Sequence, residues 1–296
     1  MIIVNIKGGL GNQMFQYALA HCIAKKNNTT IACDLRYLNE RKGEKNYVIR
    51  NFDLGIFGIA PNEPSKLTLL KSGMLFGGYK ARYLLAKIFD KLGFFVISER
   101  GPDFEARVLD KNSKNIYLDG YWQSEKYFIA NESDIKKLFT FDKSKFPKKI
   151  TQLAEKIASD GKAVCINVRR GDFIGSKNHE VTGIGYFIKA VDHIKKTIDD
   201  PNIYIFSDDV EWCELNLANL FNNVIVVGHE YAGKSFDSYL YLMTQFSGYI
   251  IPNSTFAWWA AWLSRKPNKK VIVPKLWSGL DNLNNADIVP DSWIRV

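Results

Sequence analysis

Short apolar runs separated by segments with helical periodicity dominate the second half of the chain. Buried-type strands are expected at 163–168, 203–206, 224–227, 249–251 and 271–273. Strands that alternate with helices in this way form a parallel, doubly wound sheet. The pattern therefore predicts a Rossmann-like α/β domain in this half.

The first residues show a compact strand, loop, helix and strand pattern. An apolar run at 2–6 leads into a glycine-rich loop at 8–13, and a helix with one apolar face precedes a second strand at 30–33. Between about 40 and 116 the pattern is irregular, and mixed structure is expected. Inside it, an apolar stripe over 81–92 lies opposite lysines, which favours the core face of a surface helix over a helix that lies on a membrane.

Lysines crowd the stretch 136–149, which also contains Pro147. Such a composition predicts a hydrated connection between two periodic regions. We therefore place the boundary between an N-terminal domain, 1–147, and a C-terminal domain, 148–296. The expected fold is α/β, with two Rossmann-like domains facing each other across a cleft.

The composition is that of a globular protein with an anionic partner. The 296 residues are 46% hydrophobic and carry a formal net charge of +9. That charge suits a nucleic acid, a nucleotide or an acidic membrane surface. The four cysteines form no C-x-x-C pair and are expected to be reduced core thiols.

The expected location is the cytoplasm. The strand pattern at 2–6 leaves no room for a signal peptide, and no apolar run approaches the roughly 18 to 20 residues of a membrane span. Peripheral contact with the inner face of a bacterial membrane stays open. The four histidines show no metal-ligand spacing and no P-loop is present, so zinc hydrolase and P-loop kinase readings fail.

Two adjacent arginines, Arg169 and Arg170, follow the predicted strand 163–168. Arginine grips phosphate with paired donors, and ligands of parallel α/β sheets bind at the carboxyl ends of the strands. The alternative is a structural ion pair with a neighbour such as Asp172. We favour a site for a phosphorylated donor, in which one of the two arginines is structural.

The loop containing Gly8, Gly9 and Gly11 lets a ligand approach a helix N-terminus. Asp34 stands at a suitable distance for a ribose contact, which suggests a dinucleotide fingerprint. However, Met14 occupies the place of the third small residue, so an NAD site is weakly indicated. A simple tight turn is the structural alternative.

Two further loops follow predicted strands. Asn253, Ser254 and Thr255 are good helix N-caps, and the amides of residues 254–256 suit a phosphate. Asp208 and Asp209 have three alternatives: contact with a guanine edge or ribose, ligation of a divalent metal, or helix capping. We favour base recognition, because the arginines already supply the charge that a metal would bring.

Four motifs in order along the chain resemble the bacterial α-1,2-fucosyltransferases. They are GGLGNQMFQYA at 8–18, GYWQS at 120–124, VRRGD at 168–172 and NSTFAWW at 253–259. The resemblance implies a GT-B-like fold, an inverting mechanism, GDP-β-L-fucose as donor and no cofactor or obligatory metal. It implies a galactose-terminated oligosaccharide or lipid-linked glycan as acceptor, with the N-terminal domain on the acceptor side and the C-terminal domain binding GDP-fucose.

The resemblance also assigns roles to residues. Arg169 matches the arginine that neutralises the β-phosphate of the donor, and Arg170 supports its loop. The general base is not assigned by the resemblance; Asp172 and Glu180 are the candidates because they lie within reach in the sequence. Asn167 stands where the family usually has His, and it does not titrate near neutral pH. The expected catalytic residues are Arg169 and Asp172. The expected donor-site residues are Asn167, Arg169, Arg170, Asp208, Asp209, Asn253, Ser254, Thr255, Phe256, Gly9, Gly11, Asn12 and Gln13.

Three other functions stay open at this point. One is a transferase of another sugar or linkage. The others are an NAD-dependent oxidoreductase built on the first β-α-β unit and a basic nucleic-acid-binding protein, which would need a continuous basic face.

Overall fold

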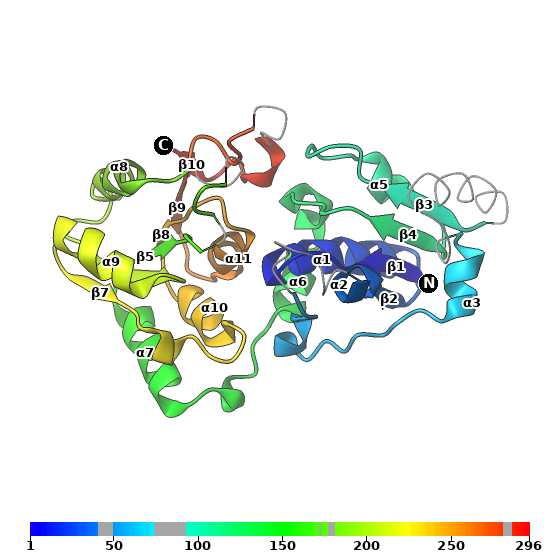
Figure 1. Cartoon of the computed structure of the whole chain (residues 1–296), viewed down its shortest axis with the longest axis horizontal. Helices are drawn as coiled ribbons and strands as arrows, with labels where there is room; N and C mark the ends of the chain where they lie inside the picture. Colours follow the sequence, from blue (N-terminus) through cyan, green and yellow to red (C-terminus); the bar gives the residue numbers. More distant parts are fainter. Residues whose placement is uncertain (41–49, 74–92, 172, 177–180, 281–285) are drawn as a thin grey trace. The chain divides into compact units, whose positions relative to one another are not determined.

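The computed structural model describes residues 1–40, 50–73, 93–171, 173–176, 181–280 and 286–296. The chain divides into two compact units, Met1–Leu138 and Phe139–Val296. Each unit is built on its own parallel sheet (Figure 1). The expected α/β class with two Rossmann-like domains is confirmed. The predicted helix over 81–92 lies outside the described residues.

Unit 1 contains a four-stranded parallel sheet in the order β2-β1-β4-β3. Its strands are β1 (Ile2–Asn5), β2 (Ile31–Asp34), β3 (Phe95–Ser98) and β4 (Ile116–Asp119). Its described helices are α1 (Leu10–Lys26), α2 (Arg36–Glu40), α3 (Lys66–Lys71), α5 (Arg107–Asp110) and α6 (Glu132–Leu138), with 3-10 turns at Leu54–Phe57, Glu125–Tyr127 and Ile129–Asn131.

The first β-α-β pattern is confirmed. β3 lies within the stretch that the sequence left irregular, and β4 begins where that stretch ends. One core cluster joins Ile3, Ala32 and Tyr117 of the sheet to Leu69 of α3. The long helix α1 is buried along most of its length and packs against β1 and β2. Burying α1 requires its polar side chains to find partners, which the glutamines described below do.

Unit 2 contains a six-stranded parallel sheet in the order β10-β9-β8-β5-β6-β7. Its strands are β5 (Ala163–Val168), β6 (Asn202–Ser207), β7 (Val224–Val226), β8 (Gly248–Ile250), β9 (Lys270–Val273) and β10 (Ile294–Arg295). Its described helices are α7 (Lys148–Ser159), α8 (Ile184–Ile194), α9 (Val210–Asn216), α10 (Asp237–Met243) and α11 (Thr255–Leu263), with 3-10 turns at Lys143–Lys145, Ala218–Leu220, His229–Tyr231 and Ala286–Ile288.

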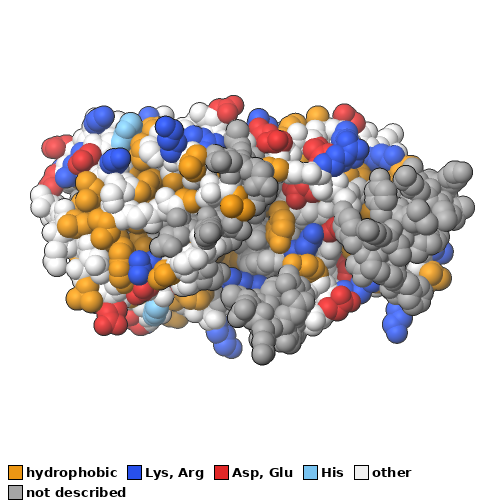
Figure 2. Space-filling model, turned by 45° about the horizontal axis from the view of Figure 1, so that its top comes forward, with side chains coloured by type: hydrophobic (Ala, Val, Ile, Leu, Met, Phe, Trp, Pro, Cys, Tyr) orange, Lys and Arg blue, Asp and Glu red, His pale blue; other side chains and the backbone are white. Residues whose placement is uncertain are grey.

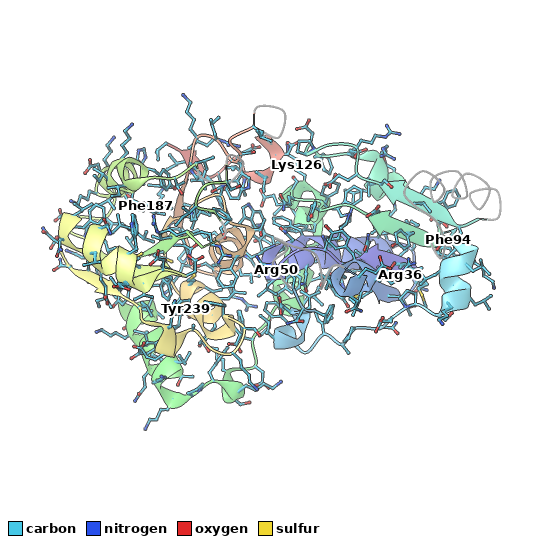
Figure 3. The ribbon with its side chains drawn as sticks, viewed as in Figure 1. Arg36, Arg50, Phe94, Lys126, Phe187 and Tyr239 are labelled. Carbon is cyan, nitrogen blue, oxygen red and sulfur yellow. The ribbon has the colours of Figure 1, made fainter. Side chains whose placement is uncertain are left out.

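Helices cover both faces of this sheet. Phe187 of α8 packs with Val164 and Ile203 on one face, and Tyr239 of α10 packs edge-on against Phe206 on the other; Phe187 and Tyr239 are labelled in Figure 3. The five strands expected in this half are all present, and within the part of unit 2 that the structure describes only the short strand β10 was not predicted. The doubly wound sheet is therefore confirmed.

The division between the units falls after Leu138, whereas the lysine-rich composition suggested a boundary after Pro147. Aromatic contacts between the segment after Leu138 and unit 2 explain why the boundary lies earlier than predicted. Phe139 is buried edge-on against Trp259, and Phe146 stacks on Tyr241 with 4.6 Å between ring centroids. The lysines at 143–149 therefore belong to a segment that packs on unit 2 through its phenylalanines.

The four cysteines are free and buried, as expected for core thiols. Burial raises the pKa of Cys22 and of Cys213 to about 11. Such thiols are unreactive at neutral pH. No described helix is long and apolar enough to cross a membrane.

Candidate active site

Three loops of unit 2 meet at one edge of its sheet. The chain passes from β5 to β6 and β7 in one direction and then from β8 to β9 and β10 in the other, so the strand order reverses between β5 and β8. Ligands of open α/β sheets bind outside the carboxyl ends of the strands at such a switch point. The loop after β5 carries Arg169 and Arg170, the loop after β8 carries Asn253 and Ser254, and Asp208 follows the neighbouring strand β6.

Asp208 holds the arginine loop in place. Its Oδ2 lies 2.9 Å from Nη1 of Arg169 and accepts the backbone N–H of Gly171 at 3.0 Å. Its Oδ1 accepts the backbone N–H of Arg170 at 2.9 Å. Both carboxylate oxygens are thus engaged by the loop, a structural role that the sequence analysis did not predict.

Gly171 allows this close approach. A Cβ atom at this position would lie 2.7 Å from Oδ2 of Asp208, closer than a side chain tolerates. The glycine that follows the arginine pair is therefore explained by the carboxylate that bonds to its backbone.

Arg170 is held by a second set of contacts. Its Nε donates to Oδ2 of Asp209 at 3.0 Å, and its guanidinium carbon lies 3.9 Å from the ring centroid of Trp212. Asp209 also caps α9 by accepting the N–H of Trp212 at 3.1 Å. Helix capping, one of the three alternatives for this aspartate pair, is therefore present at Asp209.

Asn167 and Arg169 differ in exposure. Asn167 is buried, and its amide donates to the carbonyl oxygen of Phe206 on β6 at 3.1 Å. Arg169 keeps 29% of its side chain exposed. The asparagine is thus placed to fix neighbouring strands, whereas the arginine is accessible to a ligand. Asp172 and Glu180 lie outside the described residues.

The loop after β8 begins helix α11 as the sequence predicted. Ser254 is the N-cap, and its hydroxyl accepts the N–H of Ala257 at 3.5 Å. The amide of Asn253 donates to the carbonyl oxygen of Trp277 at 3.0 Å. Thr255 and Phe256 open the helix and remain partly exposed. The amides of this first turn and the positive end of the helix dipole suit a phosphate group.

The tryptophans of the same motif are structural. Trp258 and Trp259 are fully buried, and the indole N–H of Trp258 donates to the carbonyl oxygen of Ile288 at 2.6 Å. These contacts anchor the body of α11. The motif thus combines a rigid helix with a presented N-terminus.

The glycine-rich loop of unit 1 is organised by the side chain of Gln13. This side chain is fully buried; it donates to the carbonyl oxygens of Gly8 and Asn51 and accepts the N–H of Asp53 at 2.9 Å. Gly8 has a positive φ of 73° and so needs the conformational freedom of glycine. Gln13 therefore shapes the loop from inside.

The loop is shorter than the predicted 8–13, because α1 already begins at Leu10 and Gly9 is its N-cap. Gly11, Asn12 and Gln13 therefore lie in the first turn of the helix. Gly11 is buried, whereas Gly9 is partly exposed and a Cβ there would lie 3.6 Å from the Arg50 guanidinium. The side chain of Asn12 accepts a hydrogen bond of 2.8 Å from Gln123. This bond joins the first and second motifs within unit 1.

Asp34 is already committed to protein partners. It is buried and accepts from Nε of Arg36 at 2.9 Å, from Nη2 of Arg36 at 2.6 Å and from the hydroxyl of Tyr117 at 2.7 Å. A ribose contact would have to break this arrangement, which makes the dinucleotide interpretation less favourable.

Sequence reasoning missed one residue that shapes the second motif. Glu99 accepts the backbone N–H groups of Tyr121 and Trp122, each at 2.7 Å. Trp122 is buried with a positive φ of 56°, and Gly120 leaves no room for a Cβ beside Glu99. Nothing in the local pattern around Glu99 marks it. Gly120, which precedes Tyr121 and Trp122, was the only signal in the sequence that the backbone here is closely packed.

The described residues on one face of the molecule show no continuous basic stripe. On the face seen in Figure 2, lysines and arginines are interspersed with acidic and hydrophobic side chains. Nucleic-acid-binding surfaces gather positive charge along one face. The view therefore gives no support to a nucleic-acid-binding function.

The comparisons with known proteins agree with the family that the motifs resemble, and the matched family model spans three of the four motifs. Residues 85–296 match the model of Glycosyl transferase family 11. The chain is 27% identical to an alpha-1,2-colitosyltransferase of Escherichia coli, with coverage of 100% of this chain and 99% of the relative. It is 28% identical to the O-antigen biosynthesis glycosyltransferase WbnK of Escherichia coli, over 98% and 99% of the two chains.

A more distant match is the galactoside 2-alpha-L-fucosyltransferase of Caenorhabditis elegans, 26% identical over 52% of this chain and 44% of the relative. Among solved structures, the NodZ alpha-1,6-fucosyltransferase soaked with GDP-fucose aligns with a TM-score of 0.48 and 16% identity, over 88% and 91% of the chains. The family match covers most of the sequence, including both arginines and helix α11. The chain is therefore a glycosyltransferase that belongs to Glycosyl transferase family 11.

Proposed function

We propose that this glycosyltransferase moves L-fucose from GDP-β-L-fucose to the 2-hydroxyl of a terminal galactose, forming an α-1,2 linkage with inversion. The observation that carries the proposal is the arginine loop at the switch point of unit 2, fixed by Asp208 and followed across the sheet edge by the N-terminus of α11. Paired guanidinium groups and helix amides are suited to the diphosphate of a nucleotide donor.

In this proposal unit 2 binds the donor. Arg169 contacts the β-phosphate, and the amides of Thr255 and Phe256 with the hydroxyls of Ser254 and Thr255 hold the diphosphate. The amide of Ser254, which the sequence also suggested, donates instead to the carbonyl oxygen of Pro252 at 2.8 Å. Asn167, Arg170 and Asp208 keep the loop in position, whereas Asp209 faces the nucleoside. Gly9, Gly11, Asn12 and Gln13 form and support the loop of unit 1 on the acceptor side.

The chemistry needs one displacement. The galactose O2 forms a bond to C1 of fucose, the bond between C1 and the β-phosphate oxygen breaks, and its electron pair leaves with GDP. Negative charge therefore grows on the phosphate, where the preorganised cation of Arg169 stabilises the transition state more than the ground state. The hydroxyl proton passes to a base, for which we propose Asp172.

A second candidate donor is an activated colitose. The match to the alpha-1,2-colitosyltransferase runs along the whole chain, whereas the match to the galactoside 2-alpha-L-fucosyltransferase of Caenorhabditis elegans covers about half of it. The α-1,2 linkage is common to the names of both relatives. The proposal therefore rests more firmly on the linkage than on the sugar.

Incubation of the purified protein with GDP-fucose and a panel of galactose-terminated acceptors, with EDTA present, tests the proposal. We expect a fucosylated product, and NMR should assign an α-1,2 linkage. A parallel incubation supplies activated colitose as the donor. Transfer of colitose but not of fucose would show that the donor is the activated colitose and not GDP-fucose. Failure of both transfers, combined with no saturable binding of GDP, would overturn the proposed function.

A further inference from the structure

The sheet of unit 1 has its own switch point. The chain goes from β1 to its neighbour β2 at one edge, then to β3 at the opposite edge, and last to β4, which lies between β1 and β3. The strand order therefore reverses between β1 and β4. The carboxyl ends of β1 and β4 therefore frame a second place where an α/β sheet binds ligands. Lys7 follows β1, and Asp119 ends β4.

Lys7 and Asp119 form a partly buried polar pair at this place. Nζ of Lys7 lies 2.6 Å from Oδ1 of Asp119, and each side chain keeps 15% of its surface exposed. Asn5 donates to the same oxygen at 2.9 Å. Among the described residues, none donates to Oδ2 of Asp119. The pair thus offers an acceptor oxygen and ammonium donors in a fixed position.

Two aromatic rings flank the ammonium group. Nζ of Lys7 lies 5.8 Å from the ring centroid of Tyr37 and 5.4 Å from that of Tyr121. Tyr37 lies on α2, which follows β2, so the three neighbouring strands β2, β1 and β4 all contribute. Tyr121 is 37% exposed. Aromatic rings beside a few fixed polar groups are the usual lining of a small-molecule site.

The backbone that presents Tyr121 is rigid and strained. Glu99 fixes its N–H and that of Trp122, and the buried Trp122 has a left-handed φ of 56°. A bulky residue in this conformation is unfavourable, and such strain is concentrated at ligand sites. On the other side, Gln16 brackets Lys7 by accepting its N–H at 3.0 Å and donating to its carbonyl oxygen at 3.2 Å.

The charge of this place indicates the class of ligand. Lys7 is paired with Asp119, and the nearby Arg36 is paired with Asp34. Each cation is neutralised, so the place has no excess positive charge for a diphosphate. Ring faces, an open carboxylate oxygen and ammonium donors instead suit a neutral sugar with its hydroxyl groups and apolar C–H face.

We propose that Lys7, Asp119, Tyr37 and Tyr121 form a binding site for a neutral hexose ring of the acceptor glycan. The proposal deepens the proposed function and rests on it for the identity of the acceptor. It assigns acceptor affinity to residues of unit 1 alone.

Saturation-transfer NMR of lactose with the full chain measures the Kd for lactose and tests this site. For Tyr121→Ala we expect a Kd for lactose raised about tenfold, since the stacking surface is lost. The Kd for GDP, measured by calorimetry, should stay within about twofold of wild type. Ile129→Ala is the matched control, because Ile129 is an exposed apolar residue of unit 1 outside the site; this variant should bind lactose as wild type does.

Lactose binding by Tyr121→Ala within twofold of wild type would overturn the site, as would a wild type that does not bind lactose. If thermal unfolding shows that Tyr121→Ala is not folded, Tyr37→Ala carries the same expectation and the same criterion. A wild type that binds lactose through Tyr121 but transfers no fucose would leave this site standing and overturn the donor. If the protein transfers fucose but neither Tyr121→Ala nor Tyr37→Ala changes the Kd for lactose, the donor stands and this site is overturned.

Discussion

Arg169 and Asp208 form an ion pair with 2.9 Å between Nη1 and Oδ2, and the same carboxylate accepts two backbone N–H groups of the arginine loop. Asp208, which follows β6, is thus the ion-pair partner of Arg169 and also fixes the backbone of the loop that carries Arg169. Asp208 is therefore a positioning residue in our proposal, and its effect on activity should pass through Arg169.

Asp208→Asn should lower kcat/KM for fucose transfer by about ten- to a hundredfold, because charge-assisted hydrogen bonds contribute roughly 1.5–3 kcal/mol each. Steady-state kinetics of the two single variants and of Asp208→Asn combined with Arg169→Ala measure the effect. The double variant should be scarcely less active than Arg169→Ala alone. Additive losses would show that Asp208 acts independently of Arg169, for example on the nucleoside.

Arg169→Ala should reduce kcat by about 10² to 10³, the usual cost of losing one preorganised donor at a developing negative charge. Arg169→Lys should retain more activity than Arg169→Ala but less than wild type, because lysine keeps the charge without the planar fork. Arg265→Ala is the control, since Arg265 is an exposed arginine of the same unit. Near-normal turnover by Arg169→Ala would remove this residue from the mechanism.

Gly171→Ala should impair transfer while leaving the fold intact. The added Cβ would lie 2.7 Å from Oδ2 of Asp208, so either the loop or the Asp208 carboxylate must shift, and the contacts between them are disturbed. The matched control is Gly161→Ala in the same unit, where a Cβ would meet no atom within 4 Å. We expect the Gly171 variant to lose at least about tenfold in kcat/KM with a thermal midpoint close to that of the control. Full activity in Gly171→Ala would mean that the contact with Asp208 is dispensable.

The fold of unit 2 was predictable because its strands are buried on both faces. Such strands are continuous apolar runs, as at 163–168, and these stand out against helical periodicity. In unit 1, β3 and β4 were not predicted. They are as short as β1 and β2, but β1 and β2 flank the recognisable helix α1, whereas the pattern around β3 and β4 is irregular. Short strands of this kind are recognised by their partners in the sheet rather than by their own pattern.

The candidate site was predictable in its residue types but not in its contacts. Arginines after a strand and a serine before a helix have meaning within a short window of sequence, so Arg169 and Ser254 could be selected. The tasks of Asp208 and Glu99 depend on residues 38 and 23 positions away. Gln13, which looked like a ligand-binding side chain, turns out to be a buried support of its own loop. Such roles follow from tertiary pairing, which a single sequence does not reveal.

The buried carboxylate of Asp34 makes the stability of unit 1 dependent on pH. Burial by itself would raise the pKa of Asp34, but hydrogen bonds from Arg36 and Tyr117 outweigh burial and hold the pKa below its ordinary value. A carboxyl group whose pKa is depressed by folding stabilises the protein above its unfolded pKa, about 3.9. This stabilisation is lost as the pH falls below that value and through the folded pKa.

Asp34→Asn should therefore lower the free energy of unfolding at pH 7 by about 1–3 kcal/mol, because the amide leaves Arg36 and Tyr117 without a charged acceptor. Urea unfolding at pH 7, 5 and 3 measures the difference from wild type. It should be similar at pH 7 and 5 and smaller at pH 3, where wild-type Asp34 begins to lose its own advantage. Asp103→Asn, at an exposed position of the same unit, should change the free energy by less than about 0.5 kcal/mol. A difference that grows as the pH falls would contradict the depressed pKa and assign the stability of this cluster to packing instead.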